Sequence, residues 1–154
     1  MHYSDGDKPL FESWQSEILK AASYAACTLH HPLYQLQADK TEINAYCLAF
    51  LDSLGGPKVT GVDSKRWTGR IGEEIHFYVR DNIRVMQVRV MVRENETSKI
   101  VLESGHAYPS RLNPSIWTYV TKTEIRQIPG LVMNVLTNDL AGNISADTVV
   151  FDYE

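Results

Sequence analysis

The stretch that decides the fold is residues 74–93, EIHFYVRDNIRVMQVRVMVR, in which apolar and polar side chains alternate. Ile75, Phe77 and Val79 share one face of the first run, and every second residue from Met86 to Val92 is apolar in the second. Successive side chains of a strand point to opposite faces of a sheet. The period therefore predicts two strands, each with one buried and one solvated face.

The rest of residues 58–154 continues this strand-like pattern. Turn-forming segments separate five further strands, which we expect near residues 58–63, 99–107, 115–122, 131–138 and 146–153. About seven short strands without an intervening helix are typical of an antiparallel β-sandwich, and a barrel of similar size is the alternative.

The first 57 residues have a helical period instead. Apolar residues spaced by three and four run from Phe11 and Trp14 to Leu29, and a second stripe, which includes Cys47, runs from Ile43 to Leu54. We expect two helices, about 9–29 and 42–54, with Thr41 as the N-cap of the second and one further turn over 33–38. The predicted fold class is mainly β with an α N-terminal segment: a helix-loop-helix over 1–57, then a seven-stranded antiparallel sandwich over 58–154.

Four motifs in the strand-rich part occur in a characteristic order. They are DNIRVMQVRVMV at 81–92, VLESGHA at 101–107, IWTYVT at 116–121 and PGLVMNVLTNDLAGN at 129–143. In this order they resemble a bacterial immunoglobulin-like (Ig-like or fibronectin-III-like) domain over residues 58–154, and the helical segment stays unassigned. The resemblance implies a two-sheet Ig-like sandwich and, for function, an adhesive, spacer or assembly role.

The charge is concentrated in the helical part. Residues 1–57 contain three basic and seven acidic residues, and the remainder is balanced, so the net charge of −4 belongs to the first third. An acidic chain is a poor partner for phosphate backbones, so we expect no nucleic acid to bind. No apolar run is long enough for a membrane span, and no secretory signal is visible, which predicts a cytoplasmic location and reduced thiols at Cys27 and Cys47.

The common motifs of catalysis and metal binding do not occur in the sequence. It contains no Cys-x-x-Cys, His-Glu-x-x-His or Gly-x-Ser-x-Gly pattern and no glycine-rich phosphate loop. Asp81, Asp139 and Asn143, at expected strand ends, are interpreted as turn-forming residues, because no dense acidic loop suited to calcium is present. We therefore predict no catalytic residues, no metal site and no cofactor.

Five residues are candidates for a binding surface: Trp67, Trp117, Tyr119, Arg89 and Arg93. Trp117 and Tyr119 share one face of a strand, which is either an exposed platform of the kind that binds sugars or part of the core, and the core is favoured. Trp67 lies in the polar stretch Ser-Lys-Arg-Trp-Thr-Gly and is expected to be at least partly exposed. Arg89 and Arg93 form the outward face of their strand.

These features favour a non-enzymatic binding or assembly module, in which the helices attach the sandwich to itself or to a protein partner. The helical part would either fold back on the sandwich or pair with that of a second chain. A carbohydrate-binding module that uses exposed aromatic residues is one alternative. A small hydrolase with a site between helices and sandwich, built from His76 or His106 and nearby carboxylates, is another.

Overall fold

The computed structural model describes residues 8–153, which divide into two compact units at Gly56 and Pro57. The first unit is helical and the second consists of strands. The helices are α1 (Lys8–Thr28), α2 (Pro32–Thr41) and α3 (Ala45–Leu54). None of the helices in the described range is long and apolar enough to cross a membrane.

The helical unit has one more full helix than the sequence predicts. Residues 33–38 were expected to add a single turn, but α2 spans ten residues. His31 begins it, because its ring Nδ1 accepts the N–H of Leu33 at 3.1 Å, and Pro32 suits the first helical position. The expected N-cap role of Thr41 is wrong: Thr41 ends α2, and Asn44 caps α3 by accepting the N–H of Cys47 at 2.8 Å.

The buried face of α3 is not the stripe of large apolar residues. It consists of Ala45, Leu48, Ala49 and Asp52, and it packs together with a face of α1 that buries Ala21 and Ala25. The large apolar residues of the predicted stripe lie at the other side of the helix and are exposed or half-buried: Ile43, Tyr46, Phe50, Leu51 and Leu54. Cys47, expected to be buried with this stripe, is exposed and unbonded, as is Cys27. The side chain of Phe11 lies outside the described residues.

A buried hydrogen-bonded pair joins α2 to α3. The Tyr34 hydroxyl donates to Asp52 Oδ2 at 2.6 Å, and both residues are fully buried. Because this hydroxyl has one proton, Tyr24 is the donor in the 2.5 Å contact between the two tyrosine oxygens. Burial, followed by the hydrogen bond to Asp52, raises the pKa of Tyr34 well above its usual value. Small alanines and one polar pair thus form most of the core of this unit.

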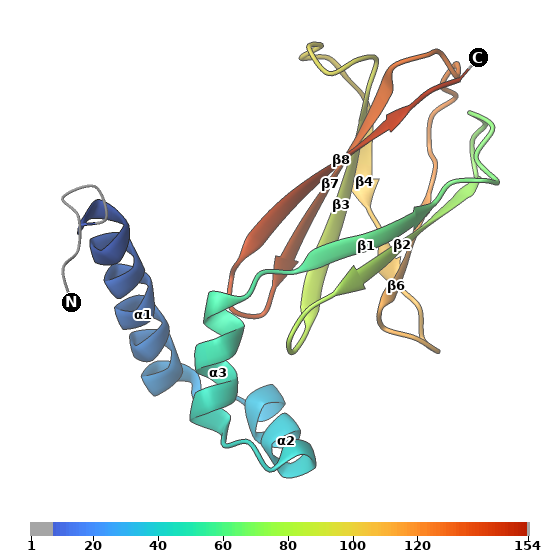
Figure 1. Cartoon of the computed structure of the whole chain (residues 1–154). Helices are drawn as coiled ribbons and strands as arrows, with labels where there is room; N and C mark the ends of the chain where they lie inside the picture. The colour runs from blue at the N-terminus through green and yellow to red at the C-terminus, as the bar shows by residue number, and fades with distance from the viewer. Residues whose placement is uncertain (1–7, 154) are drawn as a thin grey trace. The chain divides into compact units, whose positions relative to one another are not determined.

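The strand unit is a β-sandwich of two four-stranded antiparallel sheets, with strand orders β1-β2-β6-β5 and β4-β3-β7-β8 (Figure 1). All seven predicted strand regions are strands, and a two-residue strand, β5, is additional. The strands are β1 (Lys58–Asp63), β2 (Glu74–Arg80), β3 (Val85–Arg93), β4 (Val101–His106), β5 (Tyr108–Pro109), β6 (Ile116–Val120), β7 (Leu131–Asp139) and β8 (Ile144–Phe151). The chain from Val101 to Pro109 therefore changes sheets, at Ala107.

The core lies between the two sheets. The predicted inward residues of β2 and β3, among them Ile75, Phe77, Val88 and Val90, are buried. Met86 was expected on this face but is exposed, because a bulge between Val85 and Gln87 shifts the register of β3.

Glu103 on β4 joins the sheets through a buried carboxylate. It accepts the Tyr119 hydroxyl of β6 at 2.5 Å and the backbone N–H groups of Lys122 and Thr123 at 3.0 and 2.6 Å. The ring of Tyr119 can approach only because residue 105 is glycine: a Cβ there would lie 2.9 Å from Tyr119 Cε2. The carboxylate satisfies three donors at once, so it fixes the distance between the sheets at this point.

We expect Glu103→Ala to lower the free energy of unfolding by about 3 kcal/mol, because it leaves the Tyr119 hydroxyl and two backbone N–H groups without acceptors in the interior. Tyr119→Phe should cost about 1 kcal/mol, since it removes one hydrogen bond and keeps the ring. Urea denaturation measures both. Ser104→Ala, on the exposed side of the same strand, is the control and should change little; similar losses for all three variants would contradict this role of Glu103.

Candidate binding groove

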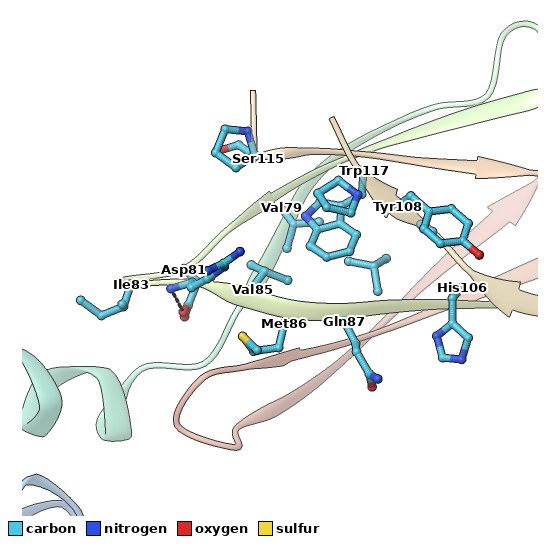
Figure 2. Close-up of a pocket in the computed structure, with 15 residues that line it drawn as sticks. Val79, Asp81, Ile83, Val85, Met86, Gln87, His106, Tyr108, Ser115 and Trp117 are labelled. Carbon is cyan, nitrogen blue, oxygen red and sulfur yellow. Dashed lines mark hydrogen bonds between the residues drawn. The ribbon is translucent and has the colours of Figure 1, made fainter. Parts of the chain in front are cut away.

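A groove of about 430 Å³ lies within the strand unit, where the chain crosses between the sheets. Figure 2 shows the residues around it. One wall is Arg84 with the start of β3, residues 85–88, and the other is Val79 with Pro114, Ser115 and Trp117. The crossing segment, residues 106–109, lines it as well, together with Asp81 and Ile83 of the β2–β3 turn.

The lining is mainly apolar with a few polar groups. Trp117 is 5% exposed, and its indole Nε1 has no hydrogen-bond partner among the described residues. Its ring lies in the middle of the side chains drawn in Figure 2. A buried N–H without an acceptor carries a free-energy cost, which a ligand with an acceptor atom at that point would remove. Volume and lining match those of typical ligand sites.

This groove was not predicted from the sequence. Its residues belong to a turn, two strand ends and a crossing segment, and they meet only through the topology. Pro109 was a usable signal, because proline within a strand pattern indicates an edge or an interruption. The pattern did not reveal that the strand expected over 99–107 ends at His106 and leaves the start of β3 uncovered on that side.

Asp81 and Asp139 bring two carboxylates together at one end of the sandwich. Asp81 Oδ2 accepts the N–H of Arg84 at 3.1 Å, while Asp139 is buried and accepts the backbone and side-chain N–H groups of Asn143 at 2.7 and 3.1 Å. Desolvation, followed by repulsion from Asp139, raises the pKa of Asp81. Asp139 and Asn143 thus form the turn expected of them. The ionised form of Asp81 is disfavoured by burial and by the neighbouring Asp139 carboxylate.

The exposure predicted for Trp67 is wrong. Trp67 is 3% exposed, and its ring packs at right angles to Phe151, with centroids 5.3 Å apart. The polar stretch around it folds over the end of the core: Glu73 accepts the N–H groups of Thr68 and Arg70, and Gln127 Nε2 donates to the Trp67 carbonyl at 2.7 Å. Polar neighbours in sequence therefore concealed a core residue.

Trp117 and Tyr119 belong to the core, as the sequence favoured. Both are at most 5% exposed. With Trp67 also buried, none of the three aromatic residues proposed for sugar stacking presents an open face. The exposed aromatic platform is therefore wrong, and Trp117 instead lines the groove.

The two arginines of the outward face of β3 have different environments. Arg89 is exposed beside His106 of β4. Arg93 donates from Nε to Asn134 Oδ1 at 2.8 Å and from Nη1 to the carbonyls of Glu96 and Ser98 at 3.1 and 3.0 Å. Arg93 therefore holds the β3–β4 turn, and Arg89 stays a candidate for contact with a partner.

The histidines of the strand unit do not form a catalytic group with a carboxylate in the groove. His106 and Asp81 both line the groove but lie at opposite ends of it (Figure 2). His76 is on the outer face, with its Nδ1 3.1 Å from Thr118 Oγ1 and its Nε2 3.5 Å from Glu74. General acid–base work needs groups within hydrogen-bond reach of one substrate atom, and neither arrangement supplies a pair at the groove.

Comparison with known proteins yields little. No family model and no curated protein matches the sequence. Among solved structures, the archaeal flagellum of Methanospirillum hungatei strain JF1 is similar to this chain with 11% identity and a TM-score of 0.41, over 97% of this chain and 94% of that one. A similarity of this degree defines neither the family nor the function.

We expect Asp81→Asn to stabilise the protein at neutral pH. The pKa of Asp81 is raised in the folded state, so its ionisation opposes folding above that pKa, while the amide keeps an acceptor for the Arg84 N–H. The gain should grow as pH rises from about 4 to 7 and vanish below about pH 4, where the carboxyl is protonated in both states. Thermal unfolding across this range measures it; a gain that does not depend on pH would contradict the electrostatic cause.

Proposed function

We propose that this protein is a non-enzymatic assembly module: an Ig-like sandwich that self-associates through the exposed apolar face of its helical unit. The observation that carries the proposal is the position of the large apolar residues of α3. The strand order supports the Ig-like part, and the composition of the helical core supports the association.

The strand order of the sandwich supports the immunoglobulin-like part of the proposal. If the strands are lettered in chain order, with β4 as C′ and β5 as D, the sheets are A-B-E-D and C′-C-F-G. Immunoglobulin domains place A, B, E and D in one sheet and C, F and G in the other. Two features differ from antibody domains: the buried Trp117 is on strand E, and both cysteines lie outside the sandwich.

The apolar face of α3 is suited to a second helix. Tyr46, Phe50 and Leu54 recur at steps of four along one side of α3, the spacing of neighbours on a helix face. Leu51 on this face is 52% exposed, and the rings of Tyr46 and Phe50 stack with centroids 6.5 Å apart. Contiguous exposed apolar surface on a small unit usually marks an interface. A second copy of the same face is its simplest complement, because apolar seams are self-complementary under two-fold symmetry.

The size of the helical core supports association. The side chains described for the three helices bury mainly alanines and gain little from the hydrophobic effect, since stabilisation is roughly proportional to buried apolar area. Units of about 50 residues are marginal even with well-filled cores. Pairing of two α3 faces would bury the large side chains that the unit leaves outside. The acidic charge of this part opposes pairing, so salt should strengthen the association.

We also propose a cytoplasmic location. The exposed thiols of Cys27 and Cys47 are unbonded, which fits a reducing compartment.

Self-association is tested by the molar mass of the full chain across concentration, by light scattering and sedimentation. We expect the mass to rise from the monomer value of 17.5 kDa towards a dimer, and to rise at lower concentration in high salt. Tyr46→Glu with Leu51→Glu should weaken the association at least about tenfold, because each carboxylate would be buried at the interface without a partner.

Two controls separate the α3 face from general stickiness. Leu112→Glu changes the most exposed large apolar residue of the described strand unit, whose exposed fraction is 98%. This variant should associate like the parent. A short bismaleimide should cross-link dimers of Cys27→Ser, which keeps Cys47 on the α3 face, more efficiently than those of Cys47→Ser. A chain that stays monomeric at all concentrations would contradict the proposal.

A further inference from the structure

We propose that the groove of the strand unit binds an extended apolar peptide segment of a partner protein, which adds as a short strand beside residues 85–88 of β3. The residues of this site are different from those of the α3 face, so peptide binding and molar mass test the two proposals separately.

The start of β3 has a strand neighbour on one side only. Residues 85–93 pair with β7, with one bulge between Val85 and Gln87, whereas the pairing with β4 covers only Arg89–Arg93. The last backbone bond on the β4 side runs from the Ala107 N–H to the Val88 carbonyl, at 2.9 Å. Within residues 8–153, no strand lies beside 85–87 on that side. The N–H and C=O of a strand residue point the same way, so the N–H of Val88 also faces the groove.

Three other sheet edges, at β4, β5 and β8, are protected against added strands. β5 is two residues long and contains Pro109. Glu103 on β4 and Asp147 on β8 stand at inward positions of their strands, opposite buried Val92 and Val135. Inward carboxylates at sheet edges discourage pairing with a foreign strand. The start of β3 has no such group, since Val85 and Val88 provide its wall of the groove.

Trp117 adds a second requirement for the ligand. Its buried Nε1 lacks an acceptor, although the surrounding surface is apolar. A peptide has both features that would complement the groove: apolar side chains at alternate positions and a carbonyl oxygen at every residue. The backbone would pair with β3 while one carbonyl accepts from the indole. An apolar small molecule would fill the volume but would leave the β3 edge unpaired.

The test uses amide and indole resonances of the isotope-labelled full chain. The probe is acetyl-Thr-Val-Thr-Val-Thr-amide. Two analogues are compared with it: one is N-methylated at the Thr residues and the other at the Val residues. We expect the probe at millimolar concentration to shift the Trp117 indole N–H and the amide of Val88. One N-methylated analogue should bind about tenfold more weakly, because it cannot donate to β3. No shift with the probe, or equal binding of both analogues, would overturn the proposal.

Variants locate the binding. Trp117→Phe keeps the ring and removes the donor, and should weaken binding about tenfold. Since Trp117 is a core residue, Ser115→Tyr provides a second variant: it fills the groove from its exposed rim and should abolish binding. Ser104→Tyr, outside the groove on the exposed side of β4, is the matched control and should bind like the parent. Unchanged binding by Ser115→Tyr would place the peptide elsewhere and overturn the proposal. The molar mass of each variant reports on self-association separately.

Discussion

The sandwich depends on the carboxylate of Glu103, which holds the two sheets together where the chain crosses between them. It accepts one hydrogen bond from the Tyr119 side chain of the opposite sheet and two from the backbone that follows β6. A buried carboxylate is tolerable only when its oxygens are satisfied, and here three donors surround it. Four residues further on, at Ala107, the chain leaves the sheet of β4, and Tyr108 joins the sheet of β6. The same crossing closes the core at one point and uncovers the start of β3 beside it.

Much of the strand unit could be predicted, because period-two alternation is a direct consequence of strand geometry. Ile75, Phe77 and Val79 are inward as expected. Met86 departs from the pattern, because a bulge adds one residue and the pattern gives no sign of it. Trp67 was misplaced for a different reason: its burial depends on Phe151 and Gln127, far away in sequence. The groove likewise joins residues that only the topology brings together.

The helical unit shows the limit of reasoning from hydrophobic stripes. A stripe identifies the apolar face of a helix but not its partner. In α3 the large residues form a convincing stripe, yet the neighbour α1 packs on the opposite, alanine-rich face. Small residues allow the axes of these two helices to come close, and the buried pair of Tyr34 and Asp52 joins α3 to α2. Both faces of α3 are present in the sequence, but the helical period does not show which of them packs against α1.

The alanine-rich contact between α1 and α3 has a consequence for how the chain responds to its own concentration. If the helical unit gains its decisive burial only when a second copy is present, its folding equilibrium follows mass action. The strand unit has a hydrophobic core of its own, so its folding equilibrium does not depend on protein concentration in this way. The chain would then contain a helical unit whose order depends on protein concentration and a strand unit that is folded at any concentration. In dilute conditions it would be a folded sandwich with a weakly ordered extension, and in crowded arrays that extension would become structure.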